Sequence, residues 1–348
     1  YLMNADGTYH RRLTENDTYD DHADWSPDGL QIVFVSDRDG NRDVYVMNKT
    51  GENTKQVTSS GNEVINDHPR WRNGEQSVAD QPPSPDQDYV LGDTFLRASD
   101  EMLMVYVPGA TFFMGSTEEE IESALSICNE ANPPYCDPQF FIFEAPQHEV
   151  TIDSFWMDQT EVTNAHFQRC VDAGVCEAPV ACTWGAPDFT DSTKANNPVV
   201  CISWDSAQSY CEWVGGRLPT EAEWEFAARG ESGFTYPWGD TFDSSLVNYC
   251  DVNCEDYWAD PEVDDGHTFS APVKSYLGNE SWVGAFDMAG NVFEWVADWF
   301  GNYPDEQFTN PTGLESGKFK VLRGGSYFYE QSRLRTSARD NLLPAEKD

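Results

Sequence analysis

The chain has no long hydrophobic run and few basic residues. Of its 348 residues, 21 are Lys or Arg and 61 are Asp or Glu, so the formal net charge is −40. This charge repels nucleic acid and anionic membranes, and we expect neither as a partner. Without a run of about 18 apolar residues, we expect no membrane-spanning helix. The carboxylates suit bound cations or basic partners, or simply a solvated acidic surface.

Cysteine is absent from the first 127 residues and after position 254. The nine cysteines are Cys128, Cys136, Cys170, Cys176, Cys182, Cys201, Cys211, Cys250 and Cys254. Their close spacings favour short disulfide loops in a secreted or periplasmic protein. Thiolate metal ligands are the alternative, although no pair of CxxC motifs is present. Sequons at Asn16, Asn48 and Asn279 mark possible N-glycosylation sites and are consistent with export.

Residues 1–72 contain an internal repeat. Met3-Asn-Ala-Asp-Gly7 recurs as Met47-Asn-Lys-Thr-Gly51, and His22-Ala-Asp-Trp25 is echoed by His68-Pro-Arg-Trp71. A period of about 44 residues with Asp-Gly turns between β-rich runs is typical of four-stranded propeller blades. The repeat resembles the TolB-type propeller, with about two incomplete blades. Such blades serve as binding platforms, and incomplete ones invite self-association.

The rest of the chain divides into a linker and a larger domain. Residues 73–100 are polar and proline-containing, which predicts a linker. From 101 to 348 the pattern predicts strands and helices in an α+β domain with long loops rich in Gly, Asp and Trp. Helices are expected at 117–127, 163–171, 204–214 and 217–229, and the last begins with a capping box of Thr220 and Glu223. A strand is expected at 147–156, and two strands joined by a Pro-Gly turn at 102–115.

The stretch from Gly284 to Phe300 combines carboxylates, an asparagine and aromatic side chains. Asp287, Asn291 and Glu294 offer oxygen ligands, and Gly290 lets the backbone turn its carbonyls toward one point. A well-packed turn that satisfies its own backbone is an equal alternative from spacing alone.

Several ordered motifs between about 101 and 341 resemble the formylglycine-generating enzyme (sulfatase-modifying factor) family. These are Val107-Pro-Gly-Ala-Thr-Phe-Phe-Met-Gly-Ser116, Glu161-Val-Thr-Asn164, Val200-Cys-Ile-Ser-Trp204, Gly216-Arg-Leu-Pro-Thr-Glu-Ala-Glu-Trp-Glu-Phe226, Tyr236-Pro-Trp-Gly239, the stretch above and Leu322-Arg-Gly-Gly-Ser-Tyr327. The resemblance implies a C-type-lectin-like fold with calcium as a structural ion. It places one calcium site at Asp287, Gly290, Val292 and Glu294. It places a second at Asn248, Tyr249, Asp265 and His267.

The same resemblance addresses catalysis and the ends of the chain. In the oxidase members a cysteine follows Gly-Gly-Ser-Tyr-X and a second lies a few residues on, and together they bind copper. Here Tyr329 occupies the first of these positions beside Ser326, and no cysteine follows Cys254. The histidines do not form the His-x-x-x-His-x-Glu set of the family's iron enzymes either. Neither copper nor iron is therefore expected. The family partner of Cys211 lies in a C-terminal strand that this chain lacks, so we expect a fragment of a longer protein.

The sequence thus predicts a secreted, calcium-stabilised, non-catalytic binding or structural protein, such as part of an extracellular assembly. The alternative is a metal-dependent oxidase or oxygenase acting on a protein or small thiol. A third hypothesis is a receptor that binds a protein or glycan through Tyr327-Phe-Tyr329 and Trp282.

Overall fold

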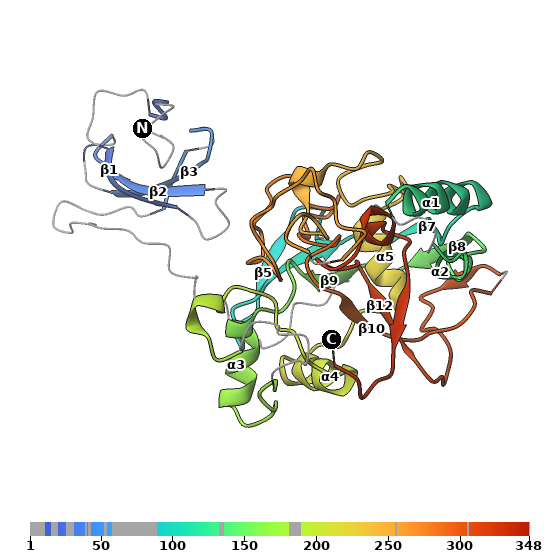
Figure 1. Ribbon diagram of the computed structural model, residues 1–348. Coiled ribbons are helices and arrows are strands. Elements are labelled where there is room, and N and C mark those ends of the chain that lie inside the picture. Colours follow the sequence, from blue (N-terminus) through green and yellow to red (C-terminus); the bar gives the residue numbers. More distant parts are fainter. Residues whose placement is uncertain are drawn as a thin grey trace. The chain divides into compact units, whose positions relative to one another are not determined.

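The computed structural model describes residues 11–14, 20–25, 31–38, 40, 43–51, 54–57, 89–131, 136–180, 189–254, 256–304 and 306–347 (Figure 1). The chain forms two compact units, Tyr1–Val78 and Ala79–Asp348. In the described ranges, no helix has both the length and the apolar character needed to cross a membrane.

The described part of the first unit is one antiparallel sheet. Its strands follow the chain order β1 (Asp20–Trp25), β2 (Gln31–Ser36), β3 (Asp43–Asn48) and β4 (Lys55–Gln56). Ile32, Phe34, Tyr45 and Met47 form its small buried cluster. This is the four-stranded meander expected of a propeller blade. The second expected blade lies outside the described residues.

The second unit is built from three small sheets. One contains β5 (Thr94–Leu96), β6 (Leu103–Val107) and β9 (Phe155–Asp158), and another β7 (Ala110–Met114), β8 (His148–Ile152) and β11 (Phe308–Thr309). The third contains β10 (Glu294–Trp299), β12 (Lys320–Arg323) and β13 (Asp340–Leu342). The two strands expected at 102–115 are present as β6 and β7, but they lie in different sheets. The single strand expected at 147–156 is two strands, β8 and β9.

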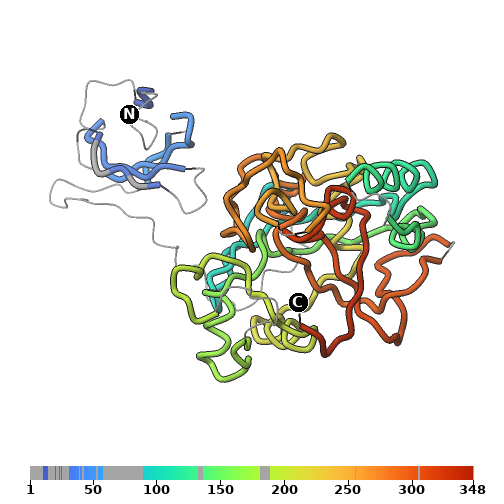
Figure 2. The backbone as a smooth tube through the Cα atoms, viewed as in Figure 1, coloured from blue at the N-terminus to red at the C-terminus, as the bar shows by residue number. Residues whose placement is uncertain are grey.

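The described α-helices are α1 (Glu118–Ala131), α2 (Gln139–Ile142), α3 (Asn164–Asp172), α4 (Trp204–Trp213) and α5 (Glu221–Arg229). Four of these five overlap the predicted ones, although α1 extends four residues beyond its prediction and α5 begins four residues later, and α2 was not predicted. Thr220 and Glu223 form the predicted capping box of α5. Short 3₁₀ helices cover Ser192–Lys194, Ser244–Leu246 and Gln331–Leu334. Between Leu246 and Glu294 the chain winds as long loops (Figure 2).

The described end of the predicted linker at 73–100 is part of the folded unit, so the linker prediction is wrong there. β5 pairs with β6, and the buried Arg97 guanidinium donates to Asp100 and Asp158 at 2.6–2.9 Å. The charged residues Arg97 and Asp100 made this segment look like a polar linker in the sequence, although they form a buried ion pair.

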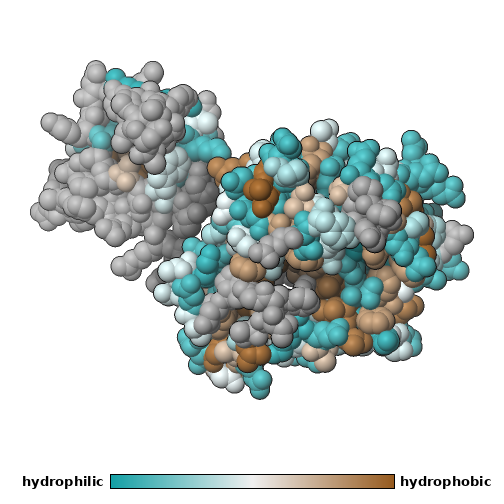
Figure 3. Space-filling model, in the orientation of Figure 1, coloured by the Kyte–Doolittle hydropathy of each residue, from teal (hydrophilic) through white to brown (hydrophobic). Residues whose placement is uncertain are grey.

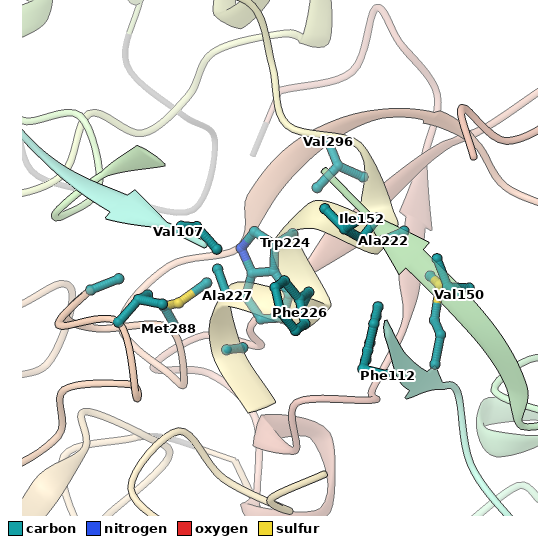
Figure 4. Packing of buried hydrophobic residues seen from close by; sticks show 14 of the residues in the cluster. Val107, Phe112, Val150, Ile152, Ala222, Trp224, Phe226, Ala227, Met288 and Val296 are labelled. Atoms are coloured by element: carbon teal, nitrogen blue, oxygen red, sulfur yellow. The ribbon is translucent and has the colours of Figure 1, made fainter. Parts of the chain in front are cut away.

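Helix α5 is the centre of the second unit, because all nine of its residues are buried. Phe112 of β7, Val150 and Ile152 of β8 and Val296 of β10 belong to the same cluster as Trp224 and Phe226 (Figure 4). Full burial of a side chain of this size stabilises the fold by roughly 2–3 kcal/mol.

The charges of α5 are neutralised by arginines from distant segments. Arg339 donates to both carboxylate oxygens of Glu221 at 2.6 and 2.8 Å. Glu225 accepts from Arg323 at 2.6 Å and from Arg229 at 3.0 Å. Because these groups are buried, each charge depends on its partner remaining in place.

Replacing Arg339 by leucine should destabilise the second unit by about 3–5 kcal/mol, because Glu221 loses its bidentate partner. Urea unfolding of the Arg339→Leu variant measures the loss. The double variant Glu221→Gln/Arg339→Leu should recover part of it. As a control, Arg169→Ala breaks the exposed Arg169–Glu101 pair and should cost less than about 1 kcal/mol. An Arg339→Leu variant as stable as the control would contradict the role given to this pair.

Candidate functional site

The loop from Gly284 to Phe293 has an unusual backbone that brings polar groups together. Asp287, Gly290 and Asn291 all have positive φ, at 60°, 73° and 56°. A Cβ atom on Gly290 would lie 2.3 Å from the carbonyl oxygen of Asn248, so only glycine fits. Asn and Asp tolerate this conformation better than most other residues. The residues of the loop itself therefore specify its backbone conformation.

Asn291 joins four segments at the centre of this loop. Its side-chain oxygen accepts from the amide of Asn248 at 3.0 Å and from the backbone N–H of Ala271 at 2.8 Å. Its side-chain amide donates to Glu161 at 2.9 Å. Its backbone carbonyl accepts from Tyr327 N–H at 2.9 Å. The sequence suggested Asn291 as an oxygen ligand, whereas the structure uses its oxygen to hold the loops together.

Three carboxylates near this position interact electrostatically. Glu161, from the segment between β9 and α3, interacts electrostatically with both Asp287 and Glu294. Burial is the main cause that raises the pKa of all three groups. Repulsion from Asp287 also raises the pKa of Glu161 and of Glu294, whereas a hydrogen bond with Glu161 lowers that of Asp287. The pKa of Glu161 is well above its usual range, and that of Glu294 is about 7. A nearby positive charge would relieve this repulsion.

The groups that donate hydrogen bonds to these carboxylates within the described residues are neutral. Asp287 accepts from Asn279 at 2.8 Å and from the backbone N–H of Lys274 at 2.7 Å, and Glu294 accepts from Trp224 at 3.1 Å. Oε2 of Glu161 is buried and has no hydrogen-bond partner within the described residues. In those residues no three His, Cys, Asp or Glu side chains converge on one metal position. A cation held here would therefore use backbone carbonyls as well as carboxylates, as hard cations do.

The second predicted site also falls within one loop region. Asp265 accepts from His267 N–H at 2.8 Å and from the Tyr276 hydroxyl at 3.0 Å. Asn248 is buried, and its Oδ1 has no hydrogen-bond partner in the described ranges. The hydroxyl of Tyr249 donates to Asp260 at 2.7 Å, which leaves only its backbone for the predicted role. These positions remain candidates for oxygen ligands.

A cavity of about 1300 Å³ opens beside the first loop. Glu161, Glu294, Phe293, Ser326 and Tyr329 are among the residues that line it. Ser326 forms a turn, because its carbonyl accepts from the backbone N–H of Tyr329 at 3.0 Å. The Tyr329 ring packs 5.2 Å from that of Phe293. The two residues of the predicted vacated site therefore lie together on the cavity wall.

The described cysteines are largely oxidised. The short disulfides Cys128–Cys136, Cys170–Cys176 and Cys250–Cys254 are present, as the spacings predicted. Cys201 is also disulfide-bonded. Cys211 is free, and burial raises the pKa of its thiol to about 12. Its thiol is therefore protonated and unreactive at neutral pH.

The sequence reasoning missed Glu161 as a site residue and misread one sequon. Glu161 precedes a helix as a single carboxylate, and no local pattern relates it to Asp287. Asn279 is 1% exposed and donates to Asp287, so it is not accessible for glycosylation. Asn48 lies at the end of β3, and Asn16 is outside the described residues. Trp282 donates to the Phe226 carbonyl and packs edge to face against its ring, which makes it a packing residue.

Two family models match the chain. The sulfatase-modifying factor enzyme 1-like domain matches residues 94–348, and the TolB beta propeller domain matches residues 1–84. Both matches confirm the resemblances given by the motifs. The first match begins inside the predicted linker, in agreement with β5.

Comparison with individual proteins agrees with the family matches. The formylglycine-generating enzyme of Mus musculus is 30% identical over 284 residues, covering 69% of this chain and 71% of the relative. The inactive C-alpha-formylglycine-generating enzyme 2 of Mus musculus is 28% identical over 262 residues, covering 64% of this chain and 74% of the relative. The solved structure of PvdO from Pseudomonas aeruginosa has a TM-score of 0.57 at 22% identity, covering 74% of this chain and 95% of that one. The predicted α+β, C-type-lectin-like fold class is confirmed.

Replacing Asn291 by aspartate should destabilise the second unit by about 2–4 kcal/mol. The change removes the donor to Glu161 and places a further carboxylate beside it. Denaturant unfolding of Asn291→Asp without added divalent cations measures the effect. The exposed Asn196→Asp change is the matched control and should be neutral. Equal stability of the two variants would show that Asn291 does not join the loops energetically.

Proposed function

Because the chain belongs to the sulfatase-modifying factor enzyme 1-like family, we propose that it is a secreted, calcium-stabilised binding protein without the family's oxidase chemistry. The observation that carries this proposal is Tyr329 at the position of the first copper-binding cysteine. A Cu(I) site of this type needs two soft thiolate ligands. The phenol of Tyr329 is no substitute, and its ring packs against Phe293 and Phe328.

The other thiols near the cavity do not offer a replacement pair. Cys254 lines the cavity but is bonded to Cys250. Cys211 also lines it, but it is the one free thiol among the described cysteines, and the copper site needs two. The existence of a relative named as inactive is consistent with loss of catalysis within the family.

Calcium fits the two oxygen-rich loops. In the proposal, Asp287, Gly290, Val292 and Glu294 hold one ion, and Asn248, Tyr249, Asp265 and His267 hold the second. Hard oxygen donors of this kind suit calcium. The buried carboxylates and the unpartnered Oε2 of Glu161 support a positive charge at the first loop. The ion would stabilise the loops and take no part in a reaction.

Export and partner binding complete the proposal. Several disulfides in one domain suit an oxidising compartment, either extracellular or periplasmic. In the described sheet of the first unit, β1 and β4 are the outer strands. Edge strands pair readily with another chain, so this unit would associate with a protein partner or a second copy.

Removal of calcium should lower the melting temperature of the protein by about 5–10 °C, because the loss of a ligand at saturating concentration removes a few kcal/mol. Scanning calorimetry with EDTA and with excess calcium measures the shift. The Glu294→Gln variant should show a smaller calcium-dependent shift than the wild type. The exposed Glu122→Gln variant on α1 should respond as the wild type does. A melting temperature independent of calcium would refute the calcium part of the proposal.

The protein should not oxidise thiols. With Cu(I) and a cysteine-containing peptide, oxygen uptake should equal that of copper and peptide alone. An oxygen electrode measures the rate, and mass spectrometry detects any loss of the thiol. Uptake that depends on native protein, together with a changed cysteine, would instead support a metal-dependent oxidase.

A further inference from the structure

Aromatic side chains gather where two loops meet at the mouth of the cavity. Trp258 donates to the Phe328 carbonyl at 2.8 Å, and the two rings pack edge to face at 5.4 Å. Tyr257 lies 4.8 Å from Trp258 on one side, and Tyr329 lies 5.9 Å from Phe328 on the other. Phe328 is 42% exposed and Tyr257 is 62% exposed. This row of rings is therefore open to a ligand.

The segment that carries Tyr257 and Trp258 is strongly acidic. Residues 230–273 contain no Lys or Arg, and their ten carboxylates are Glu231, Asp240, Asp243, Asp251, Glu255, Asp256, Asp260, Glu262, Asp264 and Asp265. Some of these build the loop itself, as Asp251 does by accepting from the backbone N–H of Asn253 and Asp265. Hydrophilic and hydrophobic residues are intermixed on the face of the second unit shown in Figure 3.

Asp256 brings this charge to the cavity wall. Its side chain is half-buried and has no hydrogen bond or ion pair with any residue that the structure describes. The Cys250–Cys254 disulfide closes the loop just before it. Asp256 thus presents a carboxylate beside the aromatic rings, where an incoming cation would not have to displace a partner.

The arginines around the cavity are already paired. Arg97 is paired with Asp100 and Asp158, and Arg217 with Glu223. Arg333, which lies over the Tyr329 ring, is paired with Asp340 at 2.6 Å. Lys347 also lines the cavity and is exposed, without an ion pair to the described residues. Because seven Asp or Glu residues but only three Lys or Arg residues of the described chain line the cavity, it attracts positive charge.

We propose that this mouth, formed by residues 256–258 and 327–329, binds a lysine- or arginine-bearing segment of a partner protein. The aliphatic stem of such a side chain packs on the aromatic rings, and its cationic end pairs with Asp256. An arginine is favoured, because its planar guanidinium stacks on aromatic faces and pairs with carboxylates in a fixed geometry. This inference rests on the proposed binding function and names the class of its ligand.

Isothermal titration calorimetry with capped peptides tests the proposal on the whole chain in calcium buffer. A peptide of alternating glycine and arginine should bind at about 150 mM salt, at which distant surface charges are screened. Peptides in which serine or glutamate replaces arginine should not bind. Equal binding of the serine peptide would overturn the role of charge.

Matched variants distinguish peptide binding at this site from non-specific electrostatic attraction of the peptide to an acidic protein. Asp256→Asn and Phe328→Ala should each weaken binding of the arginine peptide by about fivefold or more. Glu122→Gln removes an exposed carboxylate elsewhere, and Phe113→Ala removes a ring that is 55% exposed, and both should bind as the wild type does. Circular dichroism confirms that each variant is folded.

Two outcomes would overturn the proposal. One is absence of arginine-peptide binding to the wild type, and the other is equal weakening by the control variants. Either result leaves the proposed absence of oxidase chemistry intact, because that part is tested separately by thiol oxidation and by the metal content of the protein.

Discussion

Helix α5 carries glutamates into the interior, and the arginines that neutralise them come from segments far along the chain. Arg323 and Arg339 lie 98 and 118 residues from their partners Glu225 and Glu221. A buried carboxylate without a partner costs several kcal/mol, so these contacts fix where the returning segments must lie. Arg323 ends β12 and lies three residues before Ser326, which begins the turn to Tyr329. The position of the cavity wall therefore follows from the charges of α5.

The same helix supports the oxygen-rich loop. Trp224 packs in the core and donates to Glu294, the carboxylate that begins β10. Asn291 then ties this loop to Glu161, Asn248 and Ala271. The carboxylates of this loop are therefore held by Trp224 from the core and by the side-chain amide of Asn291. These contacts stabilise the fold, so the loop does not need a catalytic role to keep its structure.

Much of this organisation could be read from the sequence because its signals are local. Thr220 and Glu223 specify the start of α5, and Gly290 marks a backbone that only glycine adopts. The cysteine spacings specify three short disulfides. The motif order also identified the family and the blade-like sheet.

The contacts that the sequence did not reveal are those between distant segments. β6 and β7 adjoin in sequence but pair with different strands, and β11 pairs in parallel with β8 across more than 150 residues. Glu161 joins Asp287 and Glu294 only through tertiary packing. Arg97 and Asp100 have the polar character of a linker, and only the fold places Asp158 beside Arg97. No local pattern encodes such pairings, because they depend on the whole core.

The metal content of the purified protein tests the central claim most directly. Elemental analysis by mass spectrometry, after dialysis against metal-free buffer, should find about two calcium ions per chain and no stoichiometric copper or iron. One equivalent of copper or iron per chain would contradict the account, since it would restore a metal centre beside Tyr329.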